Sequence, residues 1–523
     1  MTIIKNIGKI GALVCGLFLT QSCVNDLDRQ PFIEVTSATV YRDPASYKQV
    51  LAKLYAGLSL SGQQGPDGLP DITGINEGFS TYLRQYWQAQ ELPTDEAVIG
   101  WNDGSLRDFH DMDWTSNNEF LTAMYNRIYY QVTICNEFIR ETTDAKLAQR
   151  GITLTEIPAY RAEARFLRAL SYYHALDMFG NVPFVTENDA VGAALPPQIS
   201  RADLFAYIES ELKAIEADLV APKQNEYGRA DKAAAWTLLT KLYLNAETYI
   251  GQPRYTEAIE NAKKVIDTGY KLDPTYAHLF MADNHTSSEI IFPIVFDGNR
   301  SKSWGGMTFL VHAPVGGSMN PADFGINGGW GGLRTTKNLV QKFPDVTGQA
   351  DQRAMFYTQG QNLEINDLFN FNDGYAITKY KNVTSGGQKG SDIEGNFPDT
   401  DFPMLRLADV YLMYAEAVLR GGSGGDRATA IGYINQLRQR ASAATVSDIN
   451  LDFILDERAR ELYWEGHRRT DLIRFGRFVS GTYLWPWKGN VKEGQAVADY
   501  LRLYPIPASD IVANPNLKQN PGY

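Results

Sequence analysis

Residues 233–249, AAAWTLLTKLYLNAETY, and residues 255–267, YTEAIENAKKVID, decide the fold of this chain. Trp236, Leu239 and Tyr243 recur at three- and four-residue spacing, which places them on one face of a helix. Small alanines in the second segment let two helices approach while the aromatic rings fill the groove between them. The two segments therefore predict a helix pair of tetratricopeptide type with a lengthened turn. The facing stripe is expected to consist of Tyr255, Ala258, Ile259, Ala262 and Ile266.

The same pattern recurs along the chain. Residues 405–422 (LRLADVYLMYAEAVLRGG) are expected to pair with 428–441, and residues 159–180 with 202–219. Residues 120–141 (FLTAMYNRIYYQVTICNEFIRE) predict a further long helix that joins these pairs. We therefore predict a mainly α fold, a tetratricopeptide-like helix-pair scaffold whose apolar stripes form the core. Trp236 and Trp464 are assigned to such stripes, and the second seam is predicted at Ala415, Ala417, Ala430 and Ile434.

Between residues 271 and 403 the composition changes. Glycine, asparagine, aspartate and proline become dense, and short β-type runs appear at 289–296 (EIIFPIVF) and 308–315 (TFLVHAPV). The repeats are therefore expected to be interrupted by a large loop-rich insertion, and loops on a rigid scaffold are where binding sites usually lie. The predicted organisation is 37–270 as an N-terminal helical part with a ligand-site loop near 84–104, 271–403 as the insertion, and 404–523 as a C-terminal helical part.

The first residues are typical of a processing signal. Lys5 and Lys9 precede the apolar run IGALVCGLFL, which is too short to span a membrane and leads through LTQSC to Cys23. This order is typical of a bacterial lipoprotein, in which the cysteine is acylated and holds the protein to a membrane. We predict a signal peptide at 1–22 and a lipidated tether at 23–36. An ordinary signal peptide with an incidental cysteine is the alternative.

Three cysteines and an acidic balance limit the function classes. Cys15 would leave with the signal and Cys23 would carry lipid, so Cys135 remains alone, predicted as a buried, inert thiol. The formal net charge of −12 argues against nucleic acid as a partner. Aromatic residues make up 12% of the chain, which suits a ligand with apolar faces ringed by hydroxyl groups.

No catalytic motif is present in the sequence. The six histidines do not form HExxH, and there is no GxSxG elbow, P-loop or dinucleotide fingerprint. No carboxylate pair is singled out for glycoside cleavage. We therefore expect a binding protein and not an enzyme, with no cofactor; a structural calcium ion near Asp283 is an open alternative that we do not predict.

Residues 455–476, LDERARELYWEGHRRTDLIRFG, carry charges of both signs at helical spacing. One interpretation is an anion site. The other is an ion-paired helix corner with its ion pairs on the helix surface, packed by Leu462, Tyr463, Trp464 and Leu472, and we favour it. The charged residues are Glu457, Arg458, Arg460, Glu461, Glu465, Arg468, Arg469, Asp471 and Arg474.

Several of these segments together resemble one family. EARFLRALSYYHALDMFGNVPFV (163–185), DERARELYWEGHRRTDLIRFG (456–476) and LYPIPASDIVANPNLKQNPGY (503–523) are similar to the SusD/RagB outer-membrane lipoproteins of Bacteroidetes. The resemblance implies four helix pairs with a loop-rich part that carries the ligand site. It also implies capture of oligosaccharide at the cell surface for a SusC-type TonB-dependent transporter, which the binding protein covers as a lid.

The resemblance also implies the site residues. Trp304 and Trp330 match two aromatic positions of an arc in the starch-binding member, Trp101 matches a neighbouring tryptophan, and Arg84 matches a hydrogen-bonding arginine. The sequence departs from that member at Ile99, where a third arc tryptophan is expected, and at Gly104, where an asparagine is expected. Asn102 or Asp103 is a candidate to compensate. A starch-like α-glucan is the first substrate expectation; a secreted glycoside hydrolase, or a structural lid without glycan affinity, are the alternatives.

Overall fold

The computed structural model describes residues 37–190, 192 and 194–523. The predicted signal peptide (1–22), the predicted lipidation site Cys23 and the predicted tether (23–36) lie outside the described residues. Residues Lys48–Tyr523 form one compact unit, and the described residues up to Tyr47 belong to another. Within the latter, the rings of Tyr41 and Tyr47 meet edge to face with centroids 5.2 Å apart.

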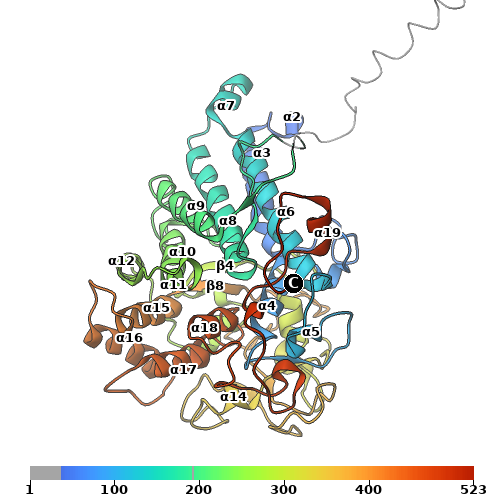
Figure 1. The fold of residues 1–523 in the computed structure, drawn as a ribbon, viewed down its shortest axis with the longest axis vertical. Coiled ribbons are helices and arrows are strands. Elements are labelled where there is room, and N and C mark those ends of the chain that lie inside the picture. Colours follow the sequence, from blue (N-terminus) through green and yellow to red (C-terminus); the bar gives the residue numbers. More distant parts are fainter. Residues whose placement is uncertain (1–36, 191, 193) are drawn as a thin grey trace, which may run out of the picture. The chain divides into compact units, whose positions relative to one another are not determined.

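Helices dominate the described part of the chain (Figure 1), and none of these helices has the length and hydrophobicity needed to cross a membrane. The helices are α2 Ser37–Val40, α3 Pro44–Ser59, α4 Tyr82–Glu91, α5 Asp108–Asp111, α6 Glu119–Glu141, α7 Asp144–Arg150, α8 Ile157–Met178, α9 Arg201–Ala214, α10 Lys232–Leu244, α11 Ala246–Ile250, α12 Tyr255–Ile266, α13 Gly306–His312, α14 Lys337–Val340, α15 Leu407–Leu419, α16 Arg427–Arg440, α17 Leu451–Leu462, α18 Arg468–Arg474 and α19 Ala508–Ala513. The strands are β1 Val98–Ile99, β2 Val182–Pro183, β3 Gln198–Ile199, β4 Ile290–Ile294, β5 Leu333–Arg334, β6 Phe356–Tyr357, β7 Ala376–Ile377 and β8 Phe402–Arg406. They pair antiparallel, two by two, as β1–β5, β2–β3, β4–β8 and β6–β7.

The helices pack in a continuous series. Helix α6 lies against α8, α8 against α9, α9 against α10, α10 against α12, α12 against α15, and α15 against both α16 and α17 (Figure 1). The predicted pairs 159–180 with 202–219, 233–249 with 255–267, and 405–422 with 428–441 are thus present as α8–α9, α10–α12 and α15–α16. The predicted mainly α, tetratricopeptide-like scaffold is confirmed.

The seams between the pairs are made by the predicted residues, with two corrections. Ala415, Ala417, Ala430 and Ile434 are all fully buried, as predicted. On α12, Val265 is buried and Ile266 only partly so, because Ile266 lies one residue beyond the stripe that faces α10. Trp236, assigned to the core, is partly exposed, and the Lys264 ammonium lies 5.4 Å from its ring centroid.

The prediction of a β-type run at 308–315 is wrong, because residues 306–312 form helix α13. All residues of this helix are buried. A continuous apolar run does not distinguish a buried strand from a buried helix, so periodicity carries no information here. The other run, 289–296, does contain a strand, β4, which pairs with β8.

The charged segment 455–476 folds as α17 and α18 with a tight turn between them. The interpretation as an ion-paired helix corner is confirmed, but the ion pairs are not on the helix surface. Eight of the predicted charged residues are buried, with exposures of 9% or less, and the side chain of the ninth, Arg474, is 3% exposed. Trp464 is fully buried as predicted, yet it sits in the turn with φ +64° and not on a helical stripe. Helical spacing cannot show that other elements cover this face.

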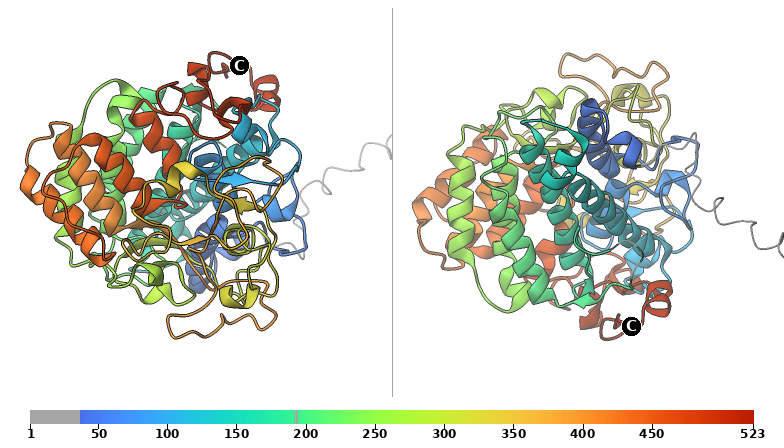
Figure 2. Two further views of the ribbon diagram at one scale, coloured as in Figure 1. Left: turned by 90° about the horizontal axis from the view of Figure 1, so that it is seen from below. Right: turned by 90° about the horizontal axis from the view of Figure 1, so that it is seen from above.

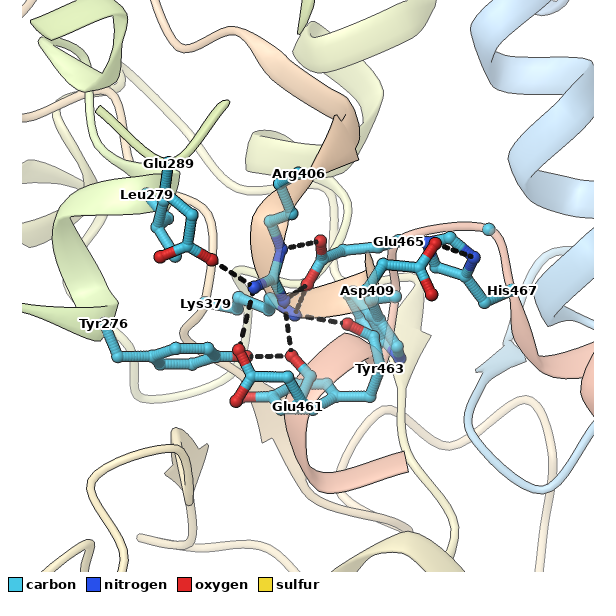
Figure 3. Close-up of polar contacts among 12 residues, drawn as sticks. Tyr276, Leu279, Glu289, Lys379, Arg406, Asp409, Glu461, Tyr463, Glu465 and His467 are labelled. Carbon is cyan, nitrogen blue, oxygen red and sulfur yellow. Dashed lines mark hydrogen bonds and ion pairs between the residues drawn. The ribbon is translucent and has the colours of Figure 1, made fainter. Parts of the chain in front are cut away.

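Arg406, at the end of β8, is the centre of this buried network (Figure 3). Its guanidinium donates to Glu465 from Nε (2.6 Å) and Nη2 (2.7 Å), and its Nη1 donates to Glu289 and Glu461, both at 2.7 Å. Lys379 adds a second cation, with Nζ 2.7 Å from Glu465 Oε1. The segments that carry Glu289 and Lys379, strand β8 and the end of α17 are therefore joined by paired charges inside the protein.

The network continues through Arg353, whose Nη1 donates to Glu457 at 2.8 Å and to Glu461 at 3.1 Å. Burial by itself raises the pKa of a carboxyl group, but the surrounding arginines more than offset it. The pKa of Glu457 is accordingly lowered to about 2. Burial is the largest single influence on that group, and Arg353 is the strongest opposing charge. The Glu457 carboxylate is therefore ionised at neutral pH.

Cys135 is a free, fully buried thiol on α6, as predicted. Burial raises its pKa to about 12, so the nucleophilic thiolate is scarce at neutral pH.

A second buried polar group lies on α4, which is buried along its whole length. The Glu91 carboxyl accepts from the backbone N–H groups of Gly466 (2.6 Å) and His467 (3.2 Å). Glu91 also adjoins the carboxyl of Glu96, and burial followed by this like charge raises the Glu91 pKa well above its ordinary value. Burial raises the pKa of Glu96 to about 7. Two adjoining buried carboxyl groups share a proton most favourably.

We expect Arg406→Met to lower the free energy of unfolding by about 3–5 kcal/mol, because removing one partner leaves Glu289, Glu461 and Glu465 buried without their cation. Guanidinium unfolding monitored by circular dichroism measures the change. Arg427→Met is the matched control, since the Arg427–Asp448 pair is 50% and 72% exposed and such pairs contribute little. Equal stability of the two variants would contradict the central role of Arg406.

The carboxyl pair predicts a pH dependence that Glu91→Gln reduces, because the variant loses the carboxyl group of Glu91 and keeps that of Glu96. Because the folded pKa values are raised, the stabilisation is full below about pH 4.5 and is lost as pH rises through about 7. Buried His110, His174 and His467, with pKa lowered to about 3, act in the opposite direction, so the variant must be compared with the wild type. Relative to wild type, the variant should gain on the order of 2 kcal/mol of unfolding free energy between pH 5 and pH 8 in urea titrations. Parallel pH curves would refute the shared proton.

Candidate functional site

A two-strand ladder brings two of the predicted site tryptophans together. Strand β1 pairs with β5 so that Ile99 lies opposite Leu333, and the Gly100 N–H extends the pairing by donating to Gly332 O at 2.9 Å. Trp101 follows β1, and Trp330 precedes β5. Their ring centroids are 6.2 Å apart with planes inclined at 46°. Figure 2 shows the yellow insertion beside the blue segment near residue 100.

Trp330 is supported from one side by His312, at the end of α13. The two rings stack with centroids 4.9 Å apart and planes inclined at 25°. The main-chain N–H of Trp330 donates to the main-chain oxygen of His312 at 2.9 Å. The two imidazole nitrogens of His312 lie 2.7 Å from Gly328 O and 2.9 Å from Asn396 O, and the single N–H of the neutral ring donates to one of these carbonyl oxygens, which fixes the supporting ring. Burial lowers the pKa of His312, which keeps the ring neutral at neutral pH. Trp330 itself is partly exposed.

The glycines around Trp330 are required by close packing. A side chain at Gly332 would place its Cβ 2.3 Å from Trp101 Cε2, and one at Gly329 would lie 2.1 Å from Val315 O. The GGWGG sequence therefore lets the backbone pass directly against Trp101 and Val315 while the Trp330 ring keeps part of its surface exposed.

Arg84 lies near Trp101 and is buried, with 3% of its surface exposed. Its guanidinium is 4.1 Å from the ring centroids of both Phe79 and Phe309, and 5.8 Å from that of Trp101. Nη1 donates to Gly78 O at 2.7 Å, whereas Nε and Nη2 have no hydrogen-bond partner among the described residues. Burial lowers the Arg84 pKa to about 9, which leaves it charged at pH 7. Direct hydrogen bonding of Arg84 to a ligand stays a prediction.

Trp304 has different partners. It lies just before α13, its Nε1 donates to Asp67 Oδ1 at 2.8 Å, and its ring centroid is 4.8 Å from that of Phe397. Gly78 lies between Trp304 and Arg84. A Cβ at Gly78 would be 3.2 Å from Trp304 Cβ, and the Gly78 carbonyl oxygen accepts from Arg84. The structure thus brings Trp101, Trp330 and Arg84 together and places Trp304 on the other side of Gly78.

The two departures from the family pattern have structural reasons. Ile99 is a buried strand residue, 3% exposed, whose N–H donates to His110 Nε2 at 2.9 Å. Gly104 has φ +48°, and a Cβ there would lie 1.5 Å from Glu119 Oε1. The loop is tied down instead by Ser105, whose N–H donates to Glu119 Oε1 at 3.2 Å. Asn102 and Asp103 are exposed in this loop, and their role stays a prediction.

Sequence reasoning missed His312, Phe309 and Phe397 as parts of the site. The first two lie in the run predicted to be a strand, and a strand prediction does not reveal their helical placement toward Trp330 and Trp101. No group of three or more His, Cys, Asp or Glu side chains in the described residues is arranged to hold a metal ion. At Asp283, where a structural calcium ion was an open alternative, the carboxylate accepts from Ser385 N–H at 2.8 Å.

Comparisons with known proteins agree with this architecture. The family model described as "SusD family" matches residues 349–523, and the one described as "Starch-binding associating with outer membrane" matches residues 29–244. Surface glycan-binding protein A from Bacteroides fluxus superimposes with a TM-score of 0.71 at 20% identity, covering 92% of this chain and 99% of that one. Surface glycan-binding protein A from Bacteroides thetaiotaomicron, solved in complex with laminarihexaose, gives a TM-score of 0.68 at 21% identity, covering 91% and 99%. These two structures share the helix-rich fold of this chain.

One relative is more similar to this chain in sequence. The starch-binding protein SusD of Bacteroides thetaiotaomicron is 37% identical over 96% of each chain. The chain therefore belongs to the SusD family.

The close packing at Gly332 makes a prediction about the site's geometry. Gly332→Ala should displace the Trp101 ring and lower the free energy of unfolding by about 1–3 kcal/mol, the usual cost of overpacking. Near-UV circular dichroism and denaturant titration measure both effects. Gly328→Ala is the control, because nothing in the described structure lies within 4 Å of a Cβ at that position. If the two variants behave alike, the Gly332 contact does not fix Trp101.

Proposed function

We propose that this protein binds a neutral oligosaccharide or polysaccharide at the cell surface, with Trp330 and Trp101 as its central contacts. The observation that carries the proposal is the partly exposed Trp330 ring, backed by His312 and flanked by Trp101. A pyranose has an apolar face of C–H groups ringed by hydroxyls. An indole ring covers such a face at a low cost in conformational entropy, because only two side-chain torsions are ordered.

A starch-like α-glucan is the proposed ligand. The support is the name of the 37%-identical relative, a starch-binding protein, and the inclination of 46° between the two indole planes. Two inclined rings fit a curved glucan better than a flat ribbon-like chain. The structural neighbour in complex with laminarihexaose leaves other glucans as competing ligands for the test.

The wider role is also a proposal. We infer that Cys23 carries the lipid anchor, that the protein sits on the outer membrane, and that it passes glycan to a SusC-type TonB-dependent transporter. The support is the family membership together with the family description of a starch-binding protein associating with the outer membrane. We infer binding without catalysis; a glycoside hydrolase and a transporter lid without glycan affinity are the alternatives.

Trp330→Ala should weaken glucan binding roughly tenfold or more, because losing about 60 Å² of apolar contact at ~25 cal/mol per Å² costs ~1.5 kcal/mol. Calorimetry with maltoheptaose, laminarihexaose and cellohexaose measures affinity and preference. Trp236→Ala, a partly exposed tryptophan on α10, is the control and should bind like wild type.

Each alternative has its own signature in the same set of experiments. Unchanged binding by Trp330→Ala would refute the site. New reducing ends after incubation with starch would indicate a hydrolase. Failure of the wild type to bind any polysaccharide, together with co-purification with a transporter, would indicate a structural lid.

A further inference from the structure

The aromatic surface does not end at Trp330, because the ring of Phe371 lies on the glycines beside it. A Cβ at Gly316 would be 2.9 Å from Phe371 Cε1, and one at Gly331 would be 3.9 Å from Phe371 Cδ2. Gly316 and Gly331 also approach each other closely, since a Cβ at Gly316 would be 2.7 Å from Gly331 Cα. The two glycines therefore form a flat floor for a partly exposed phenyl ring, and this floor includes the residue that directly follows Trp330.

The backbone that carries Phe371 is fastened to the Trp330 loop by Arg334. This fully buried arginine donates to three main-chain oxygens: Gly332 at 3.0 Å, Leu368 at 2.6 Å and Asp373 at 2.9 Å. One side chain thus joins the GGWGG loop to the 368–373 loop. Burial lowers its pKa to about 10, so it remains a cation at neutral pH and keeps all its donors.

The 368–373 loop is also stiffened from within. The Asp373 carboxylate accepts from the N–H groups of Asn366 and Asp367, both at 2.9 Å. On the other side, Asn362 N–H donates to Asn372 O at 2.7 Å, and Gln361 Nε2 donates to Phe371 O at 3.2 Å. Phe371 is therefore held in place before any ligand arrives, which reduces the entropic cost of using it for binding.

Phe369, in the same loop as Phe371, is a further exposed aromatic residue. Its side chain is 49% exposed, and the Arg107 guanidinium lies 5.7 Å from its ring centroid. Its carbonyl oxygen lies close to Gly100, the residue before Trp101, at 3.6 Å from where a Cβ would stand. A large apolar side chain left exposed beside other partly exposed aromatics is typical of a binding surface.

Resting on the proposed function, we propose that Phe371, and beyond it Phe369, form a further subsite that binds the sugar units next to those on Trp330 and Trp101. The ligand class is a neutral oligosaccharide. Phenyl rings offer apolar contact. The exposed side chain of Asn372 beside Gly317 offers an uncharged amide group that can hydrogen-bond to sugar hydroxyl groups. The subsite therefore contributes to binding of long ligands and not to binding of short ones.

The test is a length series in calorimetry on the folded protein, with maltotriose and maltoheptaose or with the corresponding short and long members of whichever glucan the wild type binds. Phe371→Ala should lose roughly tenfold in affinity for the long ligand while the short ligand binds as in wild type. Phe369→Ala should show a smaller loss of the same kind. Phe371→Leu keeps apolar contact with the glycine floor but removes the flat ring, and should behave like Phe371→Ala while remaining folded.

Val512→Ala, at an 85% exposed apolar residue on α19, is the control and should leave both affinities unchanged. Wild-type affinity of folded Phe371→Ala and Phe371→Leu for the long ligand would overturn the subsite. An equal loss for short and long ligands would overturn it as well, because Phe371 would then act only by supporting Trp330. If the wild type itself binds no glycan of any length, the proposed function fails, and the subsite fails with it.

Discussion

The neutralisation of Arg406 inside the protein is the interaction on which the rest of the structure depends. A guanidinium without exposure to solvent is tolerated only where carboxylates surround it, and these come from Glu289 just before β4 and from Glu461 and Glu465 around the end of α17. Each of these acids is in turn held by other cations. Helix α17, the two-strand ladder β4–β8 and the segment that carries Lys379 therefore cannot be packed independently, because each supplies part of one electrostatic balance.

The candidate site, although made of loops, is also held by contacts between distant segments. Trp101, His312 and Trp330 come from three separate segments, and none of them lies in a long helix that would position it alone. Their arrangement is set by the β1–β5 ladder, by α13 and by main-chain hydrogen bonds between the loops. The helical frame beneath them tolerates wide sequence change, since two solved structures share it at 20% and 21% identity.

The helical frame is predictable from the sequence because its periodic stripes are local. Leu239 and Tyr243 recur at the spacing that any buried helix face requires, and the alanines of α15 and α16 reveal where two helices meet. For the charged run 455–476, helical spacing shows which residues share a face but not what covers that face, so a surface is predicted where the protein has an interior. His312 and Arg334 escape prediction for a related reason. His312 stacks on the ring of Trp330, and both His312 and Arg334 contact carbonyl oxygens. Every residue has a carbonyl oxygen, so the sequence does not show which of them take part.

Arg334 illustrates the consequence of holding a site together through the main chain. The three oxygens that it binds belong to backbone groups, which every residue possesses, so the clamp places no demand on the identity of the side chains that the loops display. The hydrogen bonds of Arg334 would persist if the rings displayed by these loops were exchanged for others that fit against the same glycines. A surface built in this way separates the path of the loops from the side chains that the loops display. Single residues of such a surface can therefore change without rebuilding the fold beneath them.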